Sequence, residues 1–532
     1  MSSKTQPKHK LIKNLTQAHS WLGLIISSLL FIIFWAGSLT LFHEEIKQWA
    51  TVPHYPVELS ATDKPLQQLV EDTLADYRLD AQERLTVYMP NDHYPYYRLY
   101  FYAFSGDENA NSEQLRLVIN PKTGDIVGEY DQFRLADFLY RLHYDLNLPA
   151  GTELVGIVTL FFFFAIVSGI FIQGKKLFKN FFQYRSDTRR KDKLLDMHNV
   201  VGVFSLPFTA MLALSGLIFN IAIIYQASFA VFLYQGDQSA LLKDAGYTRY
   251  TEKPAQQSLD MSSAFVLIEQ ARQVPEKGIT RAAFYNYGDS QAALQLTGED
   301  PRHFAQRIET FYRLKTNEVI SHSDIENYNV LRKGKDVLAT LHFGNFAGLD
   351  LRILYFILGI AVCAMIVTGN MMWLDKARRQ QQVSEPVIKV IGNLTIGIFG
   401  GTVVATAAAF LAERVLPVSM AGRGDYLANI FVALLVLVTV LTFFVTAKKQ
   451  YIGRLLQLTA LLFFAVICAD WWAFGSELLG LWHIGYGSVL GLQLGMLILA
   501  LAFLWAGYLL ATKTRPVLPQ GVPGQEEGKL LS

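Results

Sequence analysis

Long apolar runs alternate with two polar segments along the first 380 residues, and four further apolar runs follow. The runs cover 21–42, 154–172, 200–224, 351–374, 388–411, 427–447, 455–474 and 486–511. Each is close to the roughly 20 residues that an α-helix needs to cross a bilayer. The pattern predicts an all-α polytopic membrane protein with about eight transmembrane helices.

The polar segments, 44–142 and 225–341, carry the local patterns of small α+β domains. The first has an amphipathic stretch at 65–78, strand-like stretches at 96–104 and 115–119, and a Pro- and Gly-containing turn at 120–124. Strand-like stretches of the second lie at 281–287, 291–297 and 308–315. Branched and aromatic residues bounded by turns are typical of strands. We expect these domains between spans one and two and between spans three and four.

Charge fixes the expected orientation. Residues 1–19 carry four lysines and no acid, and residues 174–193 hold eight Lys/Arg against two Asp. Basic loops stay on the cytoplasmic side, so both soluble segments are expected in the periplasm and both termini inside. No small-residue cleavage pattern follows the first run. We therefore expect an uncleaved first helix with its N-terminus in the cytoplasm.

The composition limits the kinds of disulfide, metal and cofactor sites that the chain can form. The chain has 532 residues, of which 52% are hydrophobic and 17% charged, and its net charge is +2. Its two cysteines, Cys363 and Cys468, both lie inside apolar runs. No disulfide framework or thiolate metal site can be built from them. No Gly-rich dinucleotide fingerprint occurs in a strand–helix context, and no nucleic-acid partner is expected.

The first 380 residues contain a parallel internal duplication. His19 and Gly23 align without gaps with His198 and Gly202. Eighteen residues beyond these histidines come Gly37 and Gly216, and each unit ends with a Ser/Thr-Gly pair, at 168–169 and 368–369. Each unit is span, soluble domain, span, so both units have the same membrane orientation.

The resulting predicted divisions are as follows: 1–43 first span; 44–142 first periplasmic domain; 143–193 second span and basic loop; 194–224 third span; 225–341 second periplasmic domain; 342–380 fourth span; 381–532 an appended region of four spans. The appended region has no partner in the repeat, and the sequence assigns it no role.

Four histidine motifs carry a resemblance to a known family. His-x-x-x-Gly opens spans one and three at His19 and His198, and Leu-His precedes spans two and four at His143 and His342. Together with residues 97–104 and 118–126, this pattern resembles the PepSY-associated transmembrane family over roughly 10–380. The second soluble segment departs from the PepSY pattern at 312–319, where the Asn-Pro-Lys-Thr-Gly turn is missing.

Topology sorts the histidines into two pairs. His19 and His198 begin outward-going helices and belong at the inner face, whereas His143 and His342 precede inward-going helices and belong at the outer face. We expect the repeat to bring each pair together across an axis along the membrane normal. Each pair is then predicted to supply both axial ligands of one b-type haem, because no Cys-x-x-Cys-His motif for covalent attachment is present. The alternative is that they are interface anchors or hydrogen-bonded packing residues.

The outer histidines lie about 8 to 10 residues before their apolar runs, so spans two and four are expected to extend outward to hold them. Gly23 and Gly202, one turn after their histidines, would leave room for a flat macrocycle, whereas Gly37 and Gly216 are expected to serve helix packing. Arg141 is a candidate partner for a haem propionate.

The other histidines have simpler expected roles. His43 and His54 follow span one and are expected to be surface residues, with metal or substrate binding as the alternative. His483, beside Trp482, fits an interfacial belt, with a further cofactor as the alternative. Tyrosines 94, 96, 97, 100 and 102 are expected to pack in a sheet, although they could line a binding wall.

The resemblance implies similarity to inner-membrane di-haem reductases of ferric siderophores, and with it a location in the bacterial inner membrane with PepSY-like soluble domains in the periplasm. The expected function is that of a membrane haem-b electron-transfer protein and ferric reductase, which takes electrons from a cytoplasmic reductase or from quinol. Its expected acceptor is a periplasmic ferric siderophore or another ferric chelate, and membrane lipid surrounds it. The alternative is a non-enzymatic, membrane-anchored PepSY module that binds or inhibits a periplasmic peptidase. A transporter is disfavoured, since Glu413 and Asp470 lie near span ends.

Overall fold

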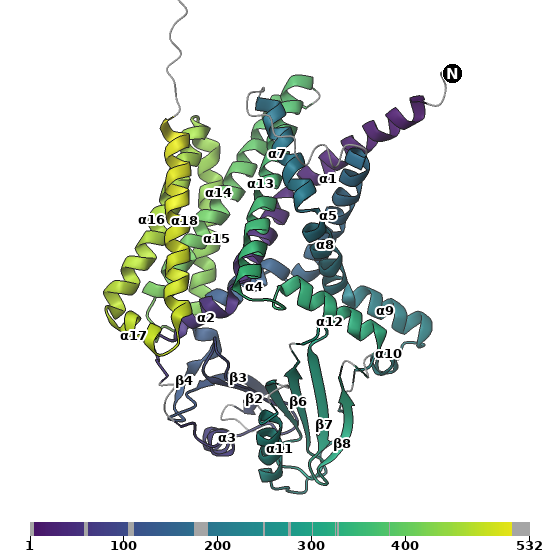
Figure 1. The fold of residues 1–532 in the computed structure, drawn as a ribbon, viewed down its shortest axis with the longest axis vertical. Helices are drawn as coiled ribbons and strands as arrows, with labels where there is room; N and C mark the ends of the chain where they lie inside the picture. The colour runs from purple at the N-terminus through teal and green to yellow at the C-terminus, as the bar shows by residue number, and fades with distance from the viewer. Residues whose placement is uncertain are drawn as a thin grey trace, which may run out of the picture.

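A computed structural model describes residues 5–57, 62–104, 111–174, 190–247, 250–274, 278–300, 302–324, 326, 329–381 and 383–512. Most of the basic 174–193 loop therefore lies outside the described residues. Figure 1 shows a helical part and a β-sheet part that lies beyond one end of the helices. We call this end the sheet side and the opposite end the far side.

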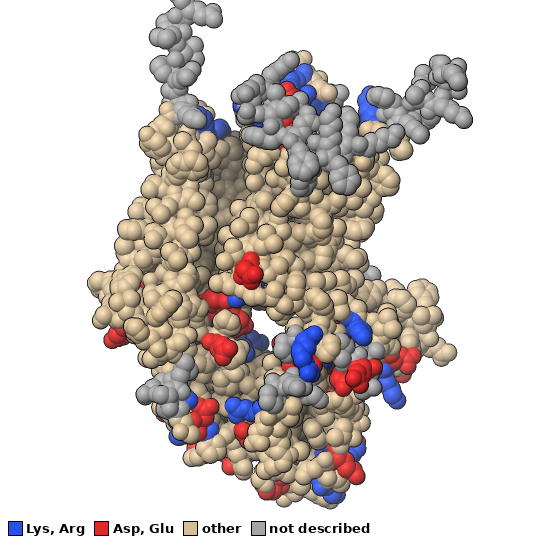
Figure 2. Space-filling view, in the orientation of Figure 1, with Lys and Arg blue, Asp and Glu red and all other residues tan. Residues whose placement is uncertain are grey.

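Among the described residues, seven continuous helices are long and apolar enough to cross a membrane: α1 (Thr5–Thr40, with Lys10–Thr40 as the candidate span), α5 (Gly151–Gln173), α13 (Leu349–Gln380), α14 (Glu385–Val415), α15 (Arg423–Phe444), α16 (Lys448–Phe474) and α18 (Gly487–Thr512). They match seven of the eight predicted runs. In the view of Figure 2 a broad band without charged side chains covers this part of the molecule. The chain is a multi-pass membrane protein.

The predicted third span is broken. α7 (Arg190–Phe204) and α8 (Leu206–Asn220) meet at an angle of 66°, and only as a pair do they make an eighth span. Pro207 stands in the first turn of α8. Proline lacks the amide proton that a continuous helix needs and its ring clashes with the preceding turn, which accounts for the break. The helix also ends at Asn220 and not at residue 224, because a new helix, α9 (Ala222–Leu233), begins two residues later.

In the described parts of the two soluble segments, the strands form one antiparallel sheet of eight strands. Its order is β4-β3-β2-β1-β5-β6-β7-β8, with bounds β1 Leu85–Tyr88, β2 Tyr97–Phe104, β3 Ser112–Ile119, β4 Ile126–Glu129, β5 Gly278–Tyr285, β6 Ala293–Glu299, β7 Arg307–Arg313 and β8 Glu318–Ser323. The halves meet where β1 pairs with β5, with Thr86 opposite Ala283. The segments expected as two separate domains are thus joined edge to edge.

The same succession of elements occurs in both halves. Helix α3 (Leu66–Leu74) precedes the first four strands and α11 (Ser262–Arg272) precedes the second four. Both helices contribute to the core on one face of the sheet, where Leu69 and Phe265 are buried together with Leu99 and Phe284. After the strands come α4 (Leu135–Tyr144) and α12 (Val330–Phe343), and then the spans α5 and α13. Element order therefore agrees with the predicted duplication.

Spans two and four do not extend outward to hold His143 and His342, so that expectation is wrong. The two histidines lie on the separate short helices α4 and α12, between the spans and the sheet (Figure 1). Between α4 and α5 the backbone takes positive φ at Leu146, Asn147 and Ala150, and α12 ends at Gly344 with φ 66°. Left-handed residues end a helix, so each short helix turns away from the span that follows it.

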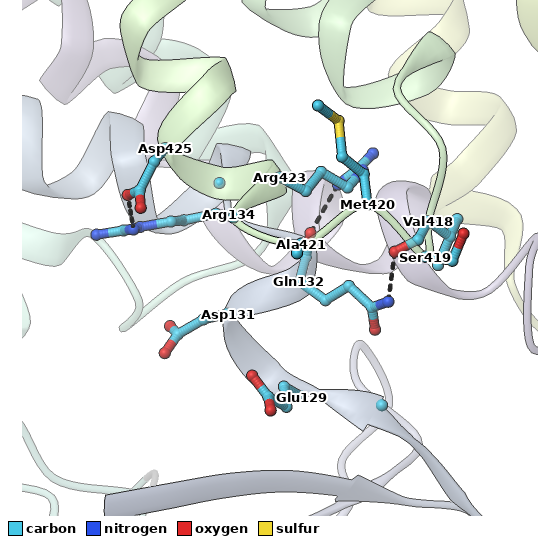
Figure 3. A pocket seen from close by; sticks show the side chains of 13 residues that line it. Glu129, Asp131, Gln132, Arg134, Val418, Ser419, Met420, Ala421, Arg423 and Asp425 are labelled. Carbon is cyan, nitrogen blue, oxygen red and sulfur yellow. Dashed lines mark hydrogen bonds and ion pairs between the residues drawn. The ribbon is translucent and has the colours of Figure 1, made fainter.

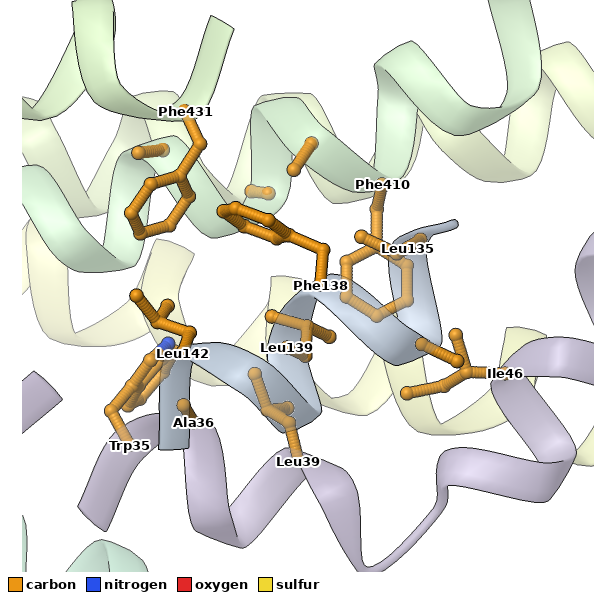
Figure 4. Close-up of a cluster of buried hydrophobic side chains, with 14 of the residues drawn as sticks. Trp35, Ala36, Leu39, Ile46, Leu135, Phe138, Leu139, Leu142, Phe410 and Phe431 are labelled. Carbon is orange, nitrogen blue, oxygen red and sulfur yellow. The ribbon is translucent and has the colours of Figure 1, made fainter. Parts of the chain in front are cut away.

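The appended helices stand as a group beside the repeat (Figure 1). They comprise α14, α15, α16, α18 and the short α17 (Glu477–His483). Their sheet-side ends pack against α4 and against α2 (His43–Thr51), the helix that follows α1. Figure 4 shows the resulting core, in which α4 side chains lie between those of α1 and those of α14 and α15.

Candidate functional site: two histidine pairs

The structure brings the four histidines together as the two predicted pairs. On the far side, His19 of α1 and His198 of α7 have ring centroids 6.3 Å apart with an interplanar angle of 89°. On the sheet side, His143 of α4 and His342 of α12 have centroids 6.0 Å apart and planes inclined by 48°. Each pair joins one histidine from each half of the repeat.

The two far-side rings are held in the same way. Nδ1 of His19 lies 3.0 Å from the main-chain oxygen of Ala165, and Nδ1 of His198 lies 3.1 Å from that of Met365. Ala165 and Met365 each stand three residues before the Ser/Thr-Gly pairs of the repeat. A carbonyl oxygen only accepts, so both rings carry their proton on Nδ1.

The Ser/Thr-Gly pairs themselves form the wall beside these rings. Ser168 lies 3.1 Å from Nδ1 of His19 through its Oγ. A Cβ placed on Gly169 would come 3.6 Å from Cε1 of His19, and one on Gly369 would come 3.4 Å from Cε1 of His198. The sequence alone identifies these residues only as markers of the repeat. Their matched spacing within the two units was the signal that could have placed them beside the rings.

The sheet-side rings are also anchored through Nδ1. That of His143 donates to the main-chain oxygen of Ile33 at 2.9 Å, and that of His342 lies 2.6 Å from Oγ of Ser215. The Ser215 hydroxyl donates its single proton to the main-chain oxygen of Met211 at 2.7 Å, so it accepts from His342. All four imidazoles therefore have Nδ1 protonated and engaged, and none of their Nε2 atoms has a hydrogen-bond partner among the described residues.

Burial keeps the sheet-side pair neutral. It lowers the pKa of His143, and burial, with a smaller effect of His143, lowers the pKa of His342 to about 3. Neutral imidazole is the form that binds a metal ion. Each of the four histidine residues is half-buried.

The geometry fits two-fold axial ligation. A metal-bound imidazole nitrogen lies about 2 Å from the ion, which puts two rings on opposite sides of one ion about 6 Å apart between centres. A ligating histidine typically donates its second ring N–H to a carbonyl or hydroxyl. Within the part of the chain that is described, no group of three or more His, Cys, Asp or Glu could hold a metal ion. Two histidines per site match the number of axial ligands that a haem takes from a protein, since the haem ring supplies the other ligands.

The pairs lie at different depths. Ile33, which binds His143, is fourteen residues after His19 on the same helix. At 1.5 Å per residue this is about 21 Å along α1, most of the roughly 30 Å hydrocarbon thickness of a bilayer.

The glycines divide differently from the expectation. A Cβ on Gly37 would come within 2.6 Å of Nδ1 of His143, so this glycine makes room for the ring and not only for a helix. Gly216 packs against Thr159 of α5, as expected. Gly23 faces open space, with no described atom within 4 Å of an added Cβ, and Gly202 faces the sulfur of Met365 at 3.4 Å.

The remaining predicted residues lie apart from the pairs or have other partners. Nε of Arg141 donates to Asp145 at 3.0 Å. His43 is not a plain surface residue: it is half-buried, 3.1 Å from Asp137, and its pKa is raised to about 9 because Asp137 and Glu44 outweigh the lowering effect of burial. His54, also half-buried, packs on Phe133 and Phe474. His483 is exposed at the end of α17.

The tyrosines serve mainly as core. Tyr94, Tyr96 and Tyr97 are buried, and Tyr100 and Tyr102 are half-buried. A cavity of about 470 Å³ lies elsewhere, between η1 (Tyr130–Gln132) and the α14–α15 loop (Figure 3). It is lined by none of the four histidines.

Comparison with known proteins agrees with the repeat. A family model described as the PepSY-associated TM region matches residues 16–376, more than half of the chain and all four paired histidines. A search of curated proteins finds no match to this chain. On the strength of the family match, the chain belongs to the PepSY-associated transmembrane family.

Proposed function

We propose that this chain is a membrane electron-transfer protein in which each histidine pair holds one b-type haem by its two Nε2 atoms. The observation that carries the proposal is the common state of the four rings: Nδ1 protonated and anchored, Nε2 without a partner among the described residues, and the rings of each pair about 6 Å apart. When bound, haem iron supplies a one-electron carrier through its ferric and ferrous states.

The chain contributes orientation, burial and insulation. Ala165, Met365, Ile33 and Ser215 fix the ring orientations through Nδ1. The pairs, about 21 Å apart along α1, divide the membrane into two steps. An electron therefore has a carrier near each face, and the apolar helices exclude water and ions between them.

The proposed direction is from the far side to the sheet side. Following the positive-inside rule, the far side faces the cytoplasm of a bacterial inner membrane and the sheet faces the periplasm. The proposed donor is quinol, which would give up two electrons in succession and release two protons as it becomes quinone, or a cytoplasmic reductase that gives up one electron per step. The proposed acceptor is ferric iron in a siderophore or similar chelate, which becomes ferrous and is bound more weakly. Arg141, two residues before His143, is the proposed partner of a haem propionate.

The surface also supports access on the sheet side. In the view of Figure 2 the molecule is hollowed between its helical part and the sheet, close to the level of α4 and α12. An acceptor that enters there would approach the sheet-side pair without crossing the bilayer.

Absorption spectroscopy of the purified full-length protein tests the proposal. We expect a reducible b-type spectrum with two haems per chain, and reoxidation of the reduced protein on mixing with a ferric siderophore. Protein purified without haem would contradict the proposal and favour the peptidase-binding module. Reduced haem that stays reduced with ferric chelates would contradict the acceptor alone.

A further inference from the structure

We infer that the appended helices α14–α18 position the helix that carries His143, and that Glu413 is the positioning residue. This inference rests on the proposed function insofar as His143 is a haem ligand. It assigns a role to the region that the repeat does not explain.

The first observation is a cap supplied by the appended region. Oε2 of Glu413, near the end of α14, accepts a hydrogen bond from the main-chain N–H of Leu135 at 3.2 Å. Leu135 is the first residue of α4, and the residue before it, Arg134, makes no side-chain cap. A helix leaves its first amide protons without partners and has positive potential at that end. A carboxylate there satisfies one proton and stabilises the helix.

The second observation is that Glu413 is itself fixed. It is buried and pairs with Nη1 of Arg423 at 2.8 Å. The same Nη1 donates to the main-chain oxygen of Gln132 at 2.7 Å, three residues before α4 begins. Figure 3 shows this contact together with the ion pair of Arg134 with Asp425, whose atoms are 2.9 Å apart. The end of α14 and the start of α15 therefore bind the chain at the first residue of α4 and at the residues just before it.

Apolar side chains along α4 also pack against the appended helices. Leu135, Phe138, Leu139 and Leu142 are all buried, and the ring of Phe138 lies 5.2 Å from that of Phe431 on α15. Figure 4 shows these side chains between α1 and the appended helices. His143 directly follows Leu142, so this packing determines where the ring stands.

The second half of the repeat provides an internal comparison. Its equivalent helix α12 has a local cap, in which Asn329 accepts from Leu331 at 2.9 Å. The buried Arg332 of α12 pairs with Glu309 of β7 at 2.7 Å. Val330 and Leu331 are exposed. Thus α12 has a cap of its own and a buried ion pair with the sheet, whereas α4, which also packs on α1 and α2, receives its cap from the appended helices.

The test is hydrogen exchange in the purified full-length protein, combined with spectroscopy of the bound haem. Glu413→Ala removes the cap, and Glu413→Gln keeps an oxygen that can accept. The matched control is Asp470→Ala, since Asp470 is another buried carboxylate of the same helices that pairs with Arg414 but contacts α2, through Nε1 of Trp49 at 2.8 Å.

We expect amide exchange in 135–144 to rise about fivefold to tenfold in Glu413→Ala, as for loss of a helix cap, with exchange in 330–343 unchanged. Glu413→Gln should recover most of the protection. The electron paramagnetic resonance signal of one haem should shift and that of the other should stay, and Asp470→Ala should do neither. Unchanged exchange in 135–144, or an equal rise in Asp470→Ala, would overturn the inference. The exchange measurement needs no haem, so protein without haem would contradict the proposed function and leave this test intact.

Discussion

The ring of His143 lies against Gly37, so closely that a Cβ at position 37 would stand 2.6 Å from Nδ1 of the ring. Nδ1 is also the atom that donates to Ile33, one turn earlier on the same helix. The face of α1 between Ile33 and Gly37 therefore forms a binding surface for the His143 imidazole, and the space exists because Gly37 has no side chain.

Substitution of Gly37 should displace His143. Gly37→Ala forces the ring or α1 to move, at a cost of about 1–3 kcal/mol for overpacking. We expect loss of one of the two haems while the other remains, measured as haem content and by redox titration. Gly491→Ala, on α18 with no described atom within 4 Å of an added Cβ, is the control. Two intact haems in Gly37→Ala would contradict the claim that Gly37 makes room for the His143 ring.

Removal of a far-side ligand should empty one site. His198→Ala leaves His19 alone, and a single axial imidazole holds haem weakly. We expect haem content to fall by half and the spectrum of the sheet-side pair to persist. His303→Ala changes an exposed histidine of the soluble part and should alter neither. Loss of both haems, or of none, in His198→Ala would refute the pairing.

Two serines each contact Nδ1 of a paired histidine, and we expect their substitution to affect haem retention differently. Ser215 provides the only described Nδ1 partner of His342, whereas His19 keeps the oxygen of Ala165 when Ser168 is changed. Loss of such a support typically lowers metal affinity by about 10–100-fold. Haem retention during dilution should therefore drop in Ser215→Ala and hardly change in Ser168→Ala. The reverse ranking would show that the Nδ1 contacts do not govern retention.

The His43–Asp137 contact predicts a pH dependence. The pKa of His43 is raised to about 9 in the folded chain, from 6.5 without its partners. A histidine whose pKa is raised by folding stabilises the folded state. This stabilisation is fully present when the pH is below the pKa of the unfolded chain, and it is lost as the pH rises through the folded pKa of about 9. We expect His43→Gln to be about 1–2 kcal/mol less stable than the parent near pH 6. The difference should vanish above about pH 10, as thermal unfolding at several pH values would measure. A difference that is constant with pH would exclude His43 as its source.

The membrane architecture was predictable because uninterrupted apolar runs of span length are typical of membrane helices and rare in soluble domains. The histidine pairing was predictable for a related reason: a repeat whose two units cross the membrane in the same direction sorts residues by depth. His19 and His198 fall at equal positions in aligned helices, so topology alone puts them at one face.

The placement of the sheet-side histidines was not predictable from periodicity. The breaks after α4 and α12 are made by left-handed residues, and on the first side these are Leu146, Asn147 and Ala150, with no glycine among them. The role of Glu413 was equally hidden. It depends on Leu135, 278 positions away in the chain, and no local pattern of α14 points to that contact.

The sequence does not predict that the two soluble segments share one sheet, because the pairing of two edge strands has no clear sequence pattern. β1 and β5 each resemble ordinary strands, and their register, with Val87 opposite Ala282, follows only from the geometry of the whole fold. The sequence departure at 312–319 does not prevent a turn between β7 and β8, where Asn317 takes a positive φ of 55°.

The seam between β1 and β5 has a consequence for how the chain is made. β1 ends at Tyr88 and β5 begins at Gly278, so during synthesis the central edge of the sheet lacks its partner for about 190 residues. At about 5–20 residues per second, this is an interval of about 10 to 40 s. In that time the first four strands have left the ribosome with an open edge, which can pair with another nascent copy. We therefore expect correct assembly to depend on how long the β1 edge stays unpaired before the second half arrives.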